Sequence, residues 1–382
     1  MDELRKDYWM VRKLGSGGFG TVYLIKHRNT REYFAAKQQP CHNYREKLYI
    51  KKEVSILKQL SNLDKRFVVQ FVNFFEGDNQ SMILTEFLEG DELFRRISAA
   101  KYNLTETKCR SFARQILNAI EFIHSRGIVH LDLKPENIVL QENIKRKSSS
   151  FAGLVGENQP NLCSAFAANC SSIASIATES SMNSEQLKII DFGLARDMEG
   201  KNQIPINLCG TIEYISPEVM RCSHASFASD MWSIGVIFYM MVTGGLSPFW
   251  AENELRTQRQ IRRGKFANGG FDNKLFKEVP DSAIDCISRL LNVNSQMRLT
   301  SSECLDHKWL TSDFFDTAKR VNTVTLRKYL ARRRWKKLFI AIKAMNRMTQ
   351  LGIFASFTNA MNTLDNIASI IPEPSNLNEV WL

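Results

Sequence analysis

The sequence predicts an α+β protein of two lobes, in which a small β-rich lobe over residues 8–88 precedes a larger helical lobe over residues 89–310. Short runs of β-branched and aromatic residues dominate the first stretch, whereas long helical patterns dominate the second. Beyond both lobes, a strongly basic stretch predicts a helical C-terminal tail. The 382 residues are enough to bury a large core.

In the small lobe, Val54, Leu57 and Leu60 recur at helical spacing and predict one helix near residues 48–60. Strands are expected on either side of it, over residues 21–25, 33–37 and 82–87. The larger lobe is expected to hold helices over residues 105–125, 226–243, 282–291 and 301–307.

Residues 143–186 break this pattern between two expected strands at 138–140 and 187–190. Ten serines and only two charged residues lie from Ser148 to Ser184. Because such a stretch has too few large apolar groups to form a core, we expect a flexible surface insertion.

The net charge of +11 belongs to one segment. Residues 319–347 hold eleven Lys and Arg, and no Asp or Glu occurs from 317 to 364; the rest of the chain carries 40 basic and 40 acidic residues. A nucleic-acid enzyme would carry its basic patch on the folded body, so we expect no nucleic-acid partner.

The start of the chain has no apolar signal region, and no run approaches the ~20 apolar residues of a membrane span. The eight cysteines follow neither a disulfide framework nor a metal-ligand spacing. We therefore expect a cytoplasmic protein with reduced thiols, without a transmembrane segment.

A Gly-rich turn between two expected strands can bring backbone N–H groups close to phosphate oxygens. Its residues are Leu14, Gly15, Ser16, Gly17, Gly18, Phe19, Gly20, Thr21 and Val22. A dinucleotide site would continue into a helix, whereas residues 21–25 are typical of a strand.

Lys37 ends the next strand, and Glu53 on the following helix is a possible partner, although a lone strand lysine is commonly just exposed. Far downstream, Asp132 and Asn137 lie in HLDLKPEN, and Asp191 begins Asp-Phe-Gly after an apolar strand. Asn137 and Asp191 supply the hard oxygen ligands that Mg²⁺ needs, and Asp132 can accept a proton from a hydroxyl nucleophile.

With these motifs in this order, followed by Ser216-Pro-Glu218, residues 8–310 resemble a eukaryotic protein kinase and its bilobal fold. HLDLKPEN and TGGLSPF are similar to the calcium/calmodulin-dependent group, in particular the myosin light chain kinases, the titin and twitchin kinases and the death-associated kinases.

The resemblance implies an ATP site with Mg²⁺, in which Lys37 contacts the α- and β-phosphates and pairs with Glu53. Asp132 would accept the proton of the substrate hydroxyl, and Lys134 would neutralise charge on the transferred phosphoryl group. Asn137 and Asp191 would hold the metal. Further nucleotide-contacting positions implied by the family are Ala35, Glu86, Leu88, Glu92 and Val139.

The same resemblance implies that Glu92, Glu136 and Glu213 hold basic residues upstream of the phosphoacceptor. Thr211 favours serine or threonine as acceptor, because its hydroxyl can bond Asp132 and Lys134. Glu218 would form a structural ion pair with Arg298, and Asp230 would hydrogen-bond the backbone of the catalytic loop.

Control by phosphorylation of the activation loop is not expected. Leu131 replaces the arginine that in many kinases binds an activation-loop phosphate, and residues 194–210 contain no Ser, Thr or Tyr. Regulation must therefore come from elsewhere.

The sequence from residue 326 to 348 predicts a basic amphipathic helix with Trp335, Phe339, Ile342 and Met348 at relative positions 1, 5, 8 and 14. Such a helix suits a membrane surface, nucleic acid or a calmodulin groove. Because this segment follows a kinase domain, calmodulin is the favoured partner, and Arg333, Arg334 and Lys336 are expected to contact it as well. Calcium would act through calmodulin, since the chain has no DxDxDG loop.

The expected organisation is a kinase domain at 8–310, an autoinhibitory and calmodulin-binding segment at 311–348 and a tail at 349–382. The leading substrate is myosin regulatory light chain, acted on by a monomer that associates with the cytoskeleton. Alternatives are a death-associated-like kinase with other substrates, a pseudokinase scaffold and a membrane-surface adaptor.

Overall fold

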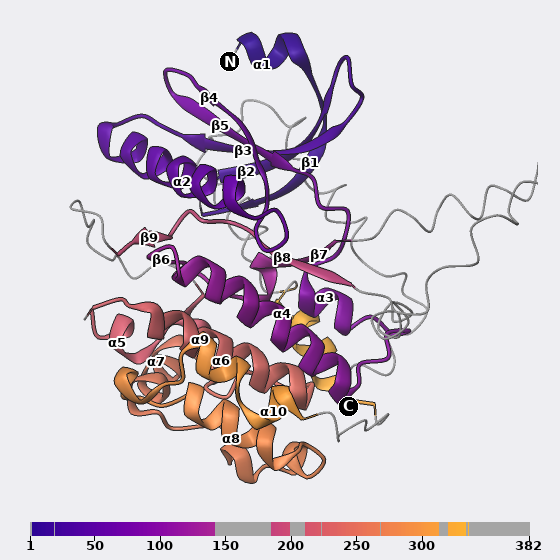
Figure 1. The fold of residues 1–382 in the computed structure, drawn as a ribbon, viewed down its shortest axis with the longest axis vertical. Helices are drawn as coiled ribbons and strands as arrows, with labels where there is room; N and C mark the ends of the chain where they lie inside the picture. The colour runs from indigo at the N-terminus through magenta and orange to yellow at the C-terminus, as the bar shows by residue number, and fades with distance from the viewer. Residues whose placement is uncertain are drawn as a thin grey trace, which may run out of the picture. The chain divides into compact units, whose positions relative to one another are not determined.

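The computed structural model describes residues 2–18, 20–141, 185–198, 211–222, 224–267, 269–312, 320–333 and 335. Two compact units divide the chain, Met1–Thr323 and Val324–Leu382. The first unit contains both lobes, and Figure 1 shows its β-rich part above its helical part. The predicted bilobal α+β architecture is therefore confirmed.

The small lobe is a five-stranded antiparallel sheet in the order β1-β2-β3-β5-β4, with the long helix α2 (Tyr44–Leu63) beside it (Figure 1). All three strands singled out from the sequence are present; β2 and β3 are longer than predicted, and β5 begins two residues earlier and ends one residue earlier than predicted. The strands are β1 (Tyr8–Gly17), β2 (Gly20–His27), β3 (Tyr33–Pro40), β4 (Phe71–Glu76) and β5 (Gln80–Glu86).

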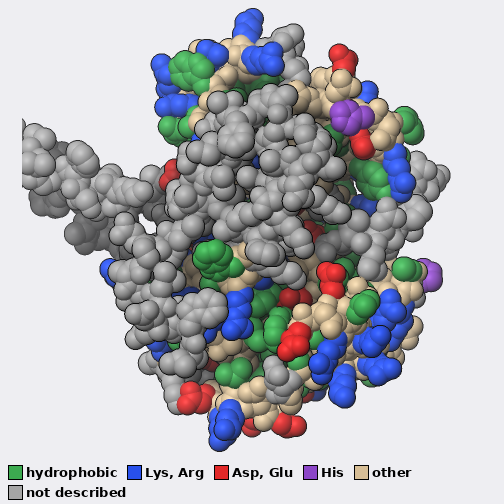
Figure 2. Space-filling view, turned by 180° about the vertical axis from the view of Figure 1, so that it is seen from behind, with side chains coloured by type: hydrophobic (Ala, Val, Ile, Leu, Met, Phe, Trp, Pro, Cys, Tyr) green, Lys and Arg blue, Asp and Glu red, His purple; other side chains and the backbone are tan. Residues whose placement is uncertain are grey.

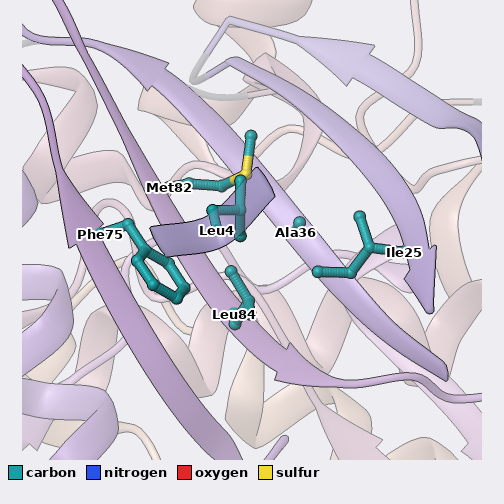
Figure 3. Close-up of a cluster of buried hydrophobic side chains, with 6 residues drawn as sticks. All are labelled: Leu4, Ile25, Ala36, Phe75, Met82 and Leu84. Carbon is teal, nitrogen blue, oxygen red and sulfur yellow. The ribbon is translucent and has the colours of Figure 1, made fainter. Parts of the chain in front are cut away.

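A compact apolar cluster fixes the sheet to a short N-terminal helix, α1 (Asp2–Asp7). Leu4 of α1 is 4% exposed and packs with side chains from four strands. Figure 3 shows these residues, which are Leu4, Ile25, Ala36, Phe75, Met82 and Leu84. Burial of this cluster stabilises the sheet from which the Gly-rich turn and Lys37 project.

The larger lobe is organised around α6 (Phe227–Thr243), whose residues from Ser229 to Thr243 are all buried. A helix that is apolar on every side lies inside a core, which explains its continuous apolar sequence. The helices α4 (Glu106–His124) and α8 (Asp281–Leu290) pack against it. The shorter helices are α3 (Leu93–Ile97), α5 (Pro217–Met220), α7 (Glu254–Arg263), α9 (Ser301–Leu305) and α10 (Lys308–Thr311).

Two small hairpins bring the functional loops together. β6 (Ile128–Val129) pairs with β9 (Arg196–Asp197), and β7 (Ile138–Gln141) pairs with β8 (Gln186–Ile189), both antiparallel. The predicted insertion 143–186 lies between β7 and β8, and its residues 143–184 lie outside the described residues. Its predicted end is too late, because β8 already begins at Gln186.

The end of the lobe differs from the predicted single helix over residues 301–307. Two short helices are formed instead, α9 and α10. The side chain of His307 accepts a hydrogen bond from the backbone N–H of Trp309 and caps α10, so a new helix begins there. The Trp309 indole then donates to Glu106 Oε1 at 2.9 Å and ties α10 to α4.

In the second unit, residues 324–333 are helical, as expected for the start of the tail. No helix in the described part of the chain is long and apolar enough to cross a membrane. The five cysteines that the structure describes are all free thiols, four of them buried.

Candidate active site

Lys37 joins two carboxylates that are far apart in the sequence. Its Nζ lies 2.7 Å from Glu53 Oε1 and 2.7 Å from Asp191 Oδ1. Burial alone would lower the pKa of Lys37, but the two carboxylates outweigh it and raise that pKa above its ordinary value. Burial would likewise raise the pKa of Asp191, yet the Lys37 ammonium holds it below its usual range. Lys37 and Asp191 are therefore charged at neutral pH.

The helix α2 presents Glu53 to Lys37. Asn43 caps its N-terminus by accepting from the Glu46 N–H, and an apolar face of α2 is buried. Glu53, only 4% exposed, also accepts a hydrogen bond of 3.0 Å from Gln39 Nε2. Sequence reasoning missed Gln39, although its position two residues after Lys37 puts it on the same face of β3.

The catalytic loop forms a second polar cluster around Asp132, which is buried. Lys134 Nζ lies 2.6 Å from Asp132 Oδ2. The Asn137 amide nitrogen donates to the backbone oxygen of Asp132 at 2.9 Å and to its Oδ2 at 3.1 Å. The three residues predicted from HLDLKPEN are thus brought together by direct hydrogen bonds.

Asp230 holds the catalytic loop from below, as expected. Its fully buried carboxylate accepts the backbone N–H groups of His130 and Leu131, both at 2.8 Å, and lies 3.0 Å from His124 Nε2. Leu131 has a φ of 63°, an uncommon conformation for a leucine that must be held by its surroundings. The α6 carboxylate supplies that constraint and so orients Asp132. The helix begins at Phe227, three residues before Asp230.

A ring contact positions the Asp-Phe-Gly segment. Phe192 is 1% exposed and packs against His130, with 4.9 Å between ring centroids, while His130 Nε2 lies 3.1 Å from the Ile190 oxygen. A Cβ on Gly193 would lie 3.2 Å from Lys37 Nζ, so glycine leaves room for the Lys37–Asp191 ion pair. Asp191 itself has a φ of 61°.

Asp191 and Asn137 fit a nucleotide-dependent Mg²⁺ site. The Asn137 nitrogen is engaged by Asp132, which leaves its Oδ1 as the polar atom for a metal, and the Asp191 carboxylate has a second oxygen beside the one bound to Lys37. Among the described residues, no group of three His, Cys, Asp or Glu could hold a metal ion. This composition fits Mg²⁺, which commonly takes one or two protein ligands together with phosphate oxygens and water.

The Gly-rich turn connects β1 to β2, where Gly17 pairs with Gly20. Gly20 has a φ of 128°, and a Cβ there would lie 2.0 Å from the Gln38 oxygen, so only glycine fits. Of the predicted nucleotide-contacting residues, Phe19 lies outside the described part, Ala35 lies on β3, and Glu92 forms a bridge with Val139.

The end of β5, next to the predicted hinge, is fixed through Glu86. Its Oε1 accepts from Lys188 Nζ at 2.5 Å and from the Gln70 N–H at 2.8 Å. Lys188 is 4% exposed and lies on β8, in a strand read from the sequence as apolar. This pair was missed, because no local spacing relates residues 102 positions apart.

The predicted substrate-binding residues come from three elements. Glu92 precedes α3 and is exposed, Glu136 lies in the turn η1 (Pro135–Asn137), and Glu213 lies in η4 (Ile212–Tyr214). In the described part of the chain, the Thr211 hydroxyl makes no hydrogen bond to Asp132 or Lys134. That expected contact is therefore not formed; Lys134 and Asn137 both bond Oδ2 of Asp132 instead.

Glu218 forms the predicted structural ion pair. Arg298 donates to both of its carboxylate oxygens, at 2.7 and 2.6 Å, and the Arg298 side chain is fully buried. The guanidinium also donates to the Ala228 oxygen and lies 5.0 Å from the Trp232 ring centroid. Burial would raise the pKa of Glu218, but Arg298 holds it below its ordinary value.

Of the predicted calmodulin-binding residues, the structure describes Arg333, whose guanidinium lies 5.7 Å from the Tyr329 ring centroid, and Trp335, which is 58% exposed. Arg334, Lys336, Phe339, Ile342 and Met348 lie outside the described residues.

Comparison with known proteins agrees with this geometry. The profile of the protein kinase domain matches residues 8–310. Smooth-muscle myosin light chain kinase of Gallus gallus is 34% identical over 352 residues, covering 92% of this chain and 16% of the relative. Myosin light chain kinase 3 of Rattus norvegicus is 35% identical over 340 residues, covering 88% of this chain and 37% of the relative. The chain thus spans less than half the length of these relatives.

Solved structures give the same result. The autoinhibited serine kinase domain of the giant muscle protein titin aligns with a TM-score of 0.66 at 28% identity, covering 86% of this chain and 88% of that one. The twitchin kinase region from C. elegans aligns with a TM-score of 0.70 at 27% identity, covering 87% of this chain and 51% of that one.

Proposed function

Because the chain belongs to the protein kinase family, we propose that it transfers the γ-phosphoryl group of ATP to a serine or threonine hydroxyl of a protein. The observation that carries this proposal is the simultaneous assembly of two clusters. Lys37 contacts Glu53 and Asp191, and Asp132 contacts Lys134 and Asn137. A pseudokinase scaffold would have no need to keep both clusters complete.

Lys37 binds the α- and β-phosphates of the nucleotide, and Glu53 holds its ammonium in place. Asn137 and Asp191 would hold Mg²⁺, which neutralises charge that develops on the phosphates. Asp191 is suited to this role because its carboxylate stays ionised beside Lys37.

Asp132 orients the attacking hydroxyl and accepts its proton. Its side chain is held in place because the Leu131 N–H before it donates to Asp230 and the Asn137 amide donates to its own Oδ2. Lys134, 2.6 Å from Asp132, balances negative charge on the phosphoryl group during transfer. Most of the catalytic effect would come from such preorganised electrostatics.

For the substrate, we propose a segment with basic residues upstream of the acceptor, held by Glu92, Glu136 and Glu213. Relatives named myosin light chain kinases support the regulatory light chain of myosin as the first substrate to test, and an association with the cytoskeleton. A death-associated-like substrate remains the alternative outcome of the same assay.

For regulation, we propose that residues 311–348 block the active site and that calcium-loaded calmodulin removes them. Leu131 in place of a phosphate-binding arginine, the basic charge of 319–347 and the similarity to the autoinhibited kinase domain of titin support this. Trp335, more than half exposed, would anchor the complex.

The test is a phosphorylation assay of the full chain with Mg²⁺-ATP, myosin regulatory light chain and a panel of basic serine peptides, with and without calcium and calmodulin. The expected result is phosphate incorporation that requires calmodulin and disappears in Asp132→Asn. If the wild-type chain binds ATP but phosphorylates none of these under any condition, the scaffold is the better description.

A further inference from the structure

One exposed face of α7 is almost entirely arginine. Thr257 and Ile261 of this helix are buried, whereas Arg256, Arg259 and Arg263 on the opposite side are exposed. Figure 2 shows Lys and Arg gathered at the edge of the larger lobe where α5 and α7 lie. Leu255, on the same face, is 65% exposed.

This face is not explained by the stability of the helix. Arginines three and four positions apart repel one another, which applies to Arg256 with Arg259 and to Arg259 with Arg263. Arg256 also lies in the first turn, where the helix dipole disfavours a cation. Only at the last turn does the dipole favour a basic residue such as Arg263.

The fold does not neutralise these charges either. Within the part of the chain that the structure describes, Arg256, Arg259 and Arg263 form no ion pair with a carboxylate. The neighbouring Arg262 differs, because its guanidinium donates to the Met220 oxygen at 3.1 Å and ties α7 to α5. The face therefore combines three cations available for a ligand with one structural arginine.

The position of α7 relates this face to the substrate. α7 packs against η4, which carries Glu213, and against α5 directly after it. A ligand on α7 would thus lie next to the segment that is proposed to hold the substrate near its acceptor residue.

We propose that the exposed face of α7 is a docking surface for an acidic segment of the protein substrate, remote from the residue that is phosphorylated. That the ligand is part of the protein substrate rests on the proposed function, whereas that the ligand is acidic follows from the positive charge of the face. Arginine forks pair with carboxylates in a two-pronged geometry, and Leu255 offers contact for one apolar side chain beside them. A membrane would instead require a broad apolar face, and α7 exposes one leucine.

Direct binding tests the surface without any catalysis. The probe is a fluorescein-labelled peptide that repeats Glu-Leu-Glu-Asp, titrated into the full chain and into Arg256→Gln/Arg259→Gln/Arg263→Gln. The matched control is Lys65→Gln/Lys274→Gln/Lys277→Gln, which removes the same charge from exposed sites elsewhere. Any binding of the peptide by the basic tail is the same in all three proteins, so it cancels in the comparison. Hydrogen exchange shows where on the chain the peptide binds.

Each exposed ion pair between an arginine of α7 and a carboxylate of the peptide is weak, so the loss of all three should lower the affinity of the α7 variant for the peptide about tenfold. In the wild type, the bound peptide should slow hydrogen exchange in residues 254–265. The control should bind nearly as the wild type does. Equal affinity of the α7 variant and the wild type, or binding to phosphatidylserine vesicles without binding to the peptide, would overturn the proposal.

Kinetics test the substrate assignment. A basic serine peptide is compared with the same peptide joined to the acidic repeat through a Gly-Ser linker at either end, with calcium and calmodulin present. In the wild type, the acidic extension should lower the KM for the peptide about tenfold, whereas in the α7 variant it should leave that KM unchanged. The two proteins should have the same kcat and the same kinetics with the short peptide. Phosphorylation with identical KM for all peptides refutes docking, whereas no phosphorylation of any peptide refutes the proposed function and leaves the binding result to decide on the surface.

Discussion

The Lys37 ammonium lies 2.7 Å from Glu53 Oε1, so a strand and a helix of the small lobe are joined at the point where phosphates are expected to bind. The same ammonium reaches Asp191 of the larger lobe at an equal distance. Both lobes therefore meet at one lysine, and the structure already holds α2 in the position that completes the site.

Replacing Glu53 by Gln should lower kcat/KM for ATP by about 10- to 100-fold. A charge-assisted hydrogen bond worth about 1.5–3 kcal/mol is weakened, and Lys37 is left to the attraction of Asp191 alone. Steady-state kinetics at varied ATP measure this. Gln39→Ala is the milder comparison, because it removes only the 3.0 Å bond to Glu53 Oε2. Unchanged kinetics in Glu53→Gln would show that the ion pair has no part in catalysis.

Asp132→Asn should lose phosphotransfer by about 10²–10⁴-fold while ATP binding stays nearly intact, because the side chain acts on the hydroxyl. Isothermal titration with ATP and Mg²⁺ and a radiolabelled phosphate assay separate the two effects. Wild-type turnover in this variant would mean that Asp132 is not the acceptor of the proton.

Glu218→Gln should destabilise the larger lobe by about 3 kcal/mol, since it leaves the fully buried Arg298 without a counter-charge. The pKa of Glu218 is depressed in the folded state, so its contribution is present above its ordinary pKa of 4.5 and is lost as pH falls through the folded value. Urea unfolding from pH 7 down to pH 3 should therefore show a shallower loss of stability in the variant. Parallel curves for both proteins would contradict this.

Removing residues 148–184 should leave a folded and active enzyme. Gln141 pairs with Gln186 at the open end of the β7–β8 hairpin, so a short turn can join the two strands. Glu185 must be kept, because it bonds Arg96 and Tyr102. Thermal unfolding and the peptide assay measure the result; loss of expression or of most activity would show that the insertion is part of the fold.

Truncation of the tail should produce an enzyme that is active without calcium, whereas Trp335→Ala should keep the full chain inactive even with calmodulin. A shift from 1% to 99% open requires about 5.5 kcal/mol of differential affinity, to which Trp335 would contribute. A truncation after Thr323 removes residues 324–348, the larger part of the proposed blocking segment, and keeps the first unit complete. Residues up to Thr323 belong to the first unit, where Val321 donates to the Leu104 oxygen at 2.8 Å. Equal, calcium-insensitive activity of the full and truncated chains would refute autoinhibition without affecting the kinase assignment.

The strands β2, β3 and β5 and the helices α2, α4, α6 and α8 followed from the sequence, because period-two and helical patterns of apolar residues are local properties. The strand β4 and the helix α7 were not predicted. The same holds for the identity of Lys37, Asp132, Asn137 and Asp191, whose motifs are short and occur in a fixed order. The end of the larger lobe was wrong in detail, because a histidine cap at residue 307 competes with continued helical propensity and only the folded backbone decides between them.

What the sequence by itself determined is therefore the list of chemical groups and the elements that carry them. The tertiary structure alone decided which groups touch: Lys37 with Asp191 across 154 positions, Glu86 with Lys188 across 102, and the catalytic-loop backbone with the Asp230 carboxylate. The same is true of the arginine face of α7, whose exposure depends on which side of the helix the lobe buries. Such pairings arise from packing between distant segments, on which local periodicity carries no information.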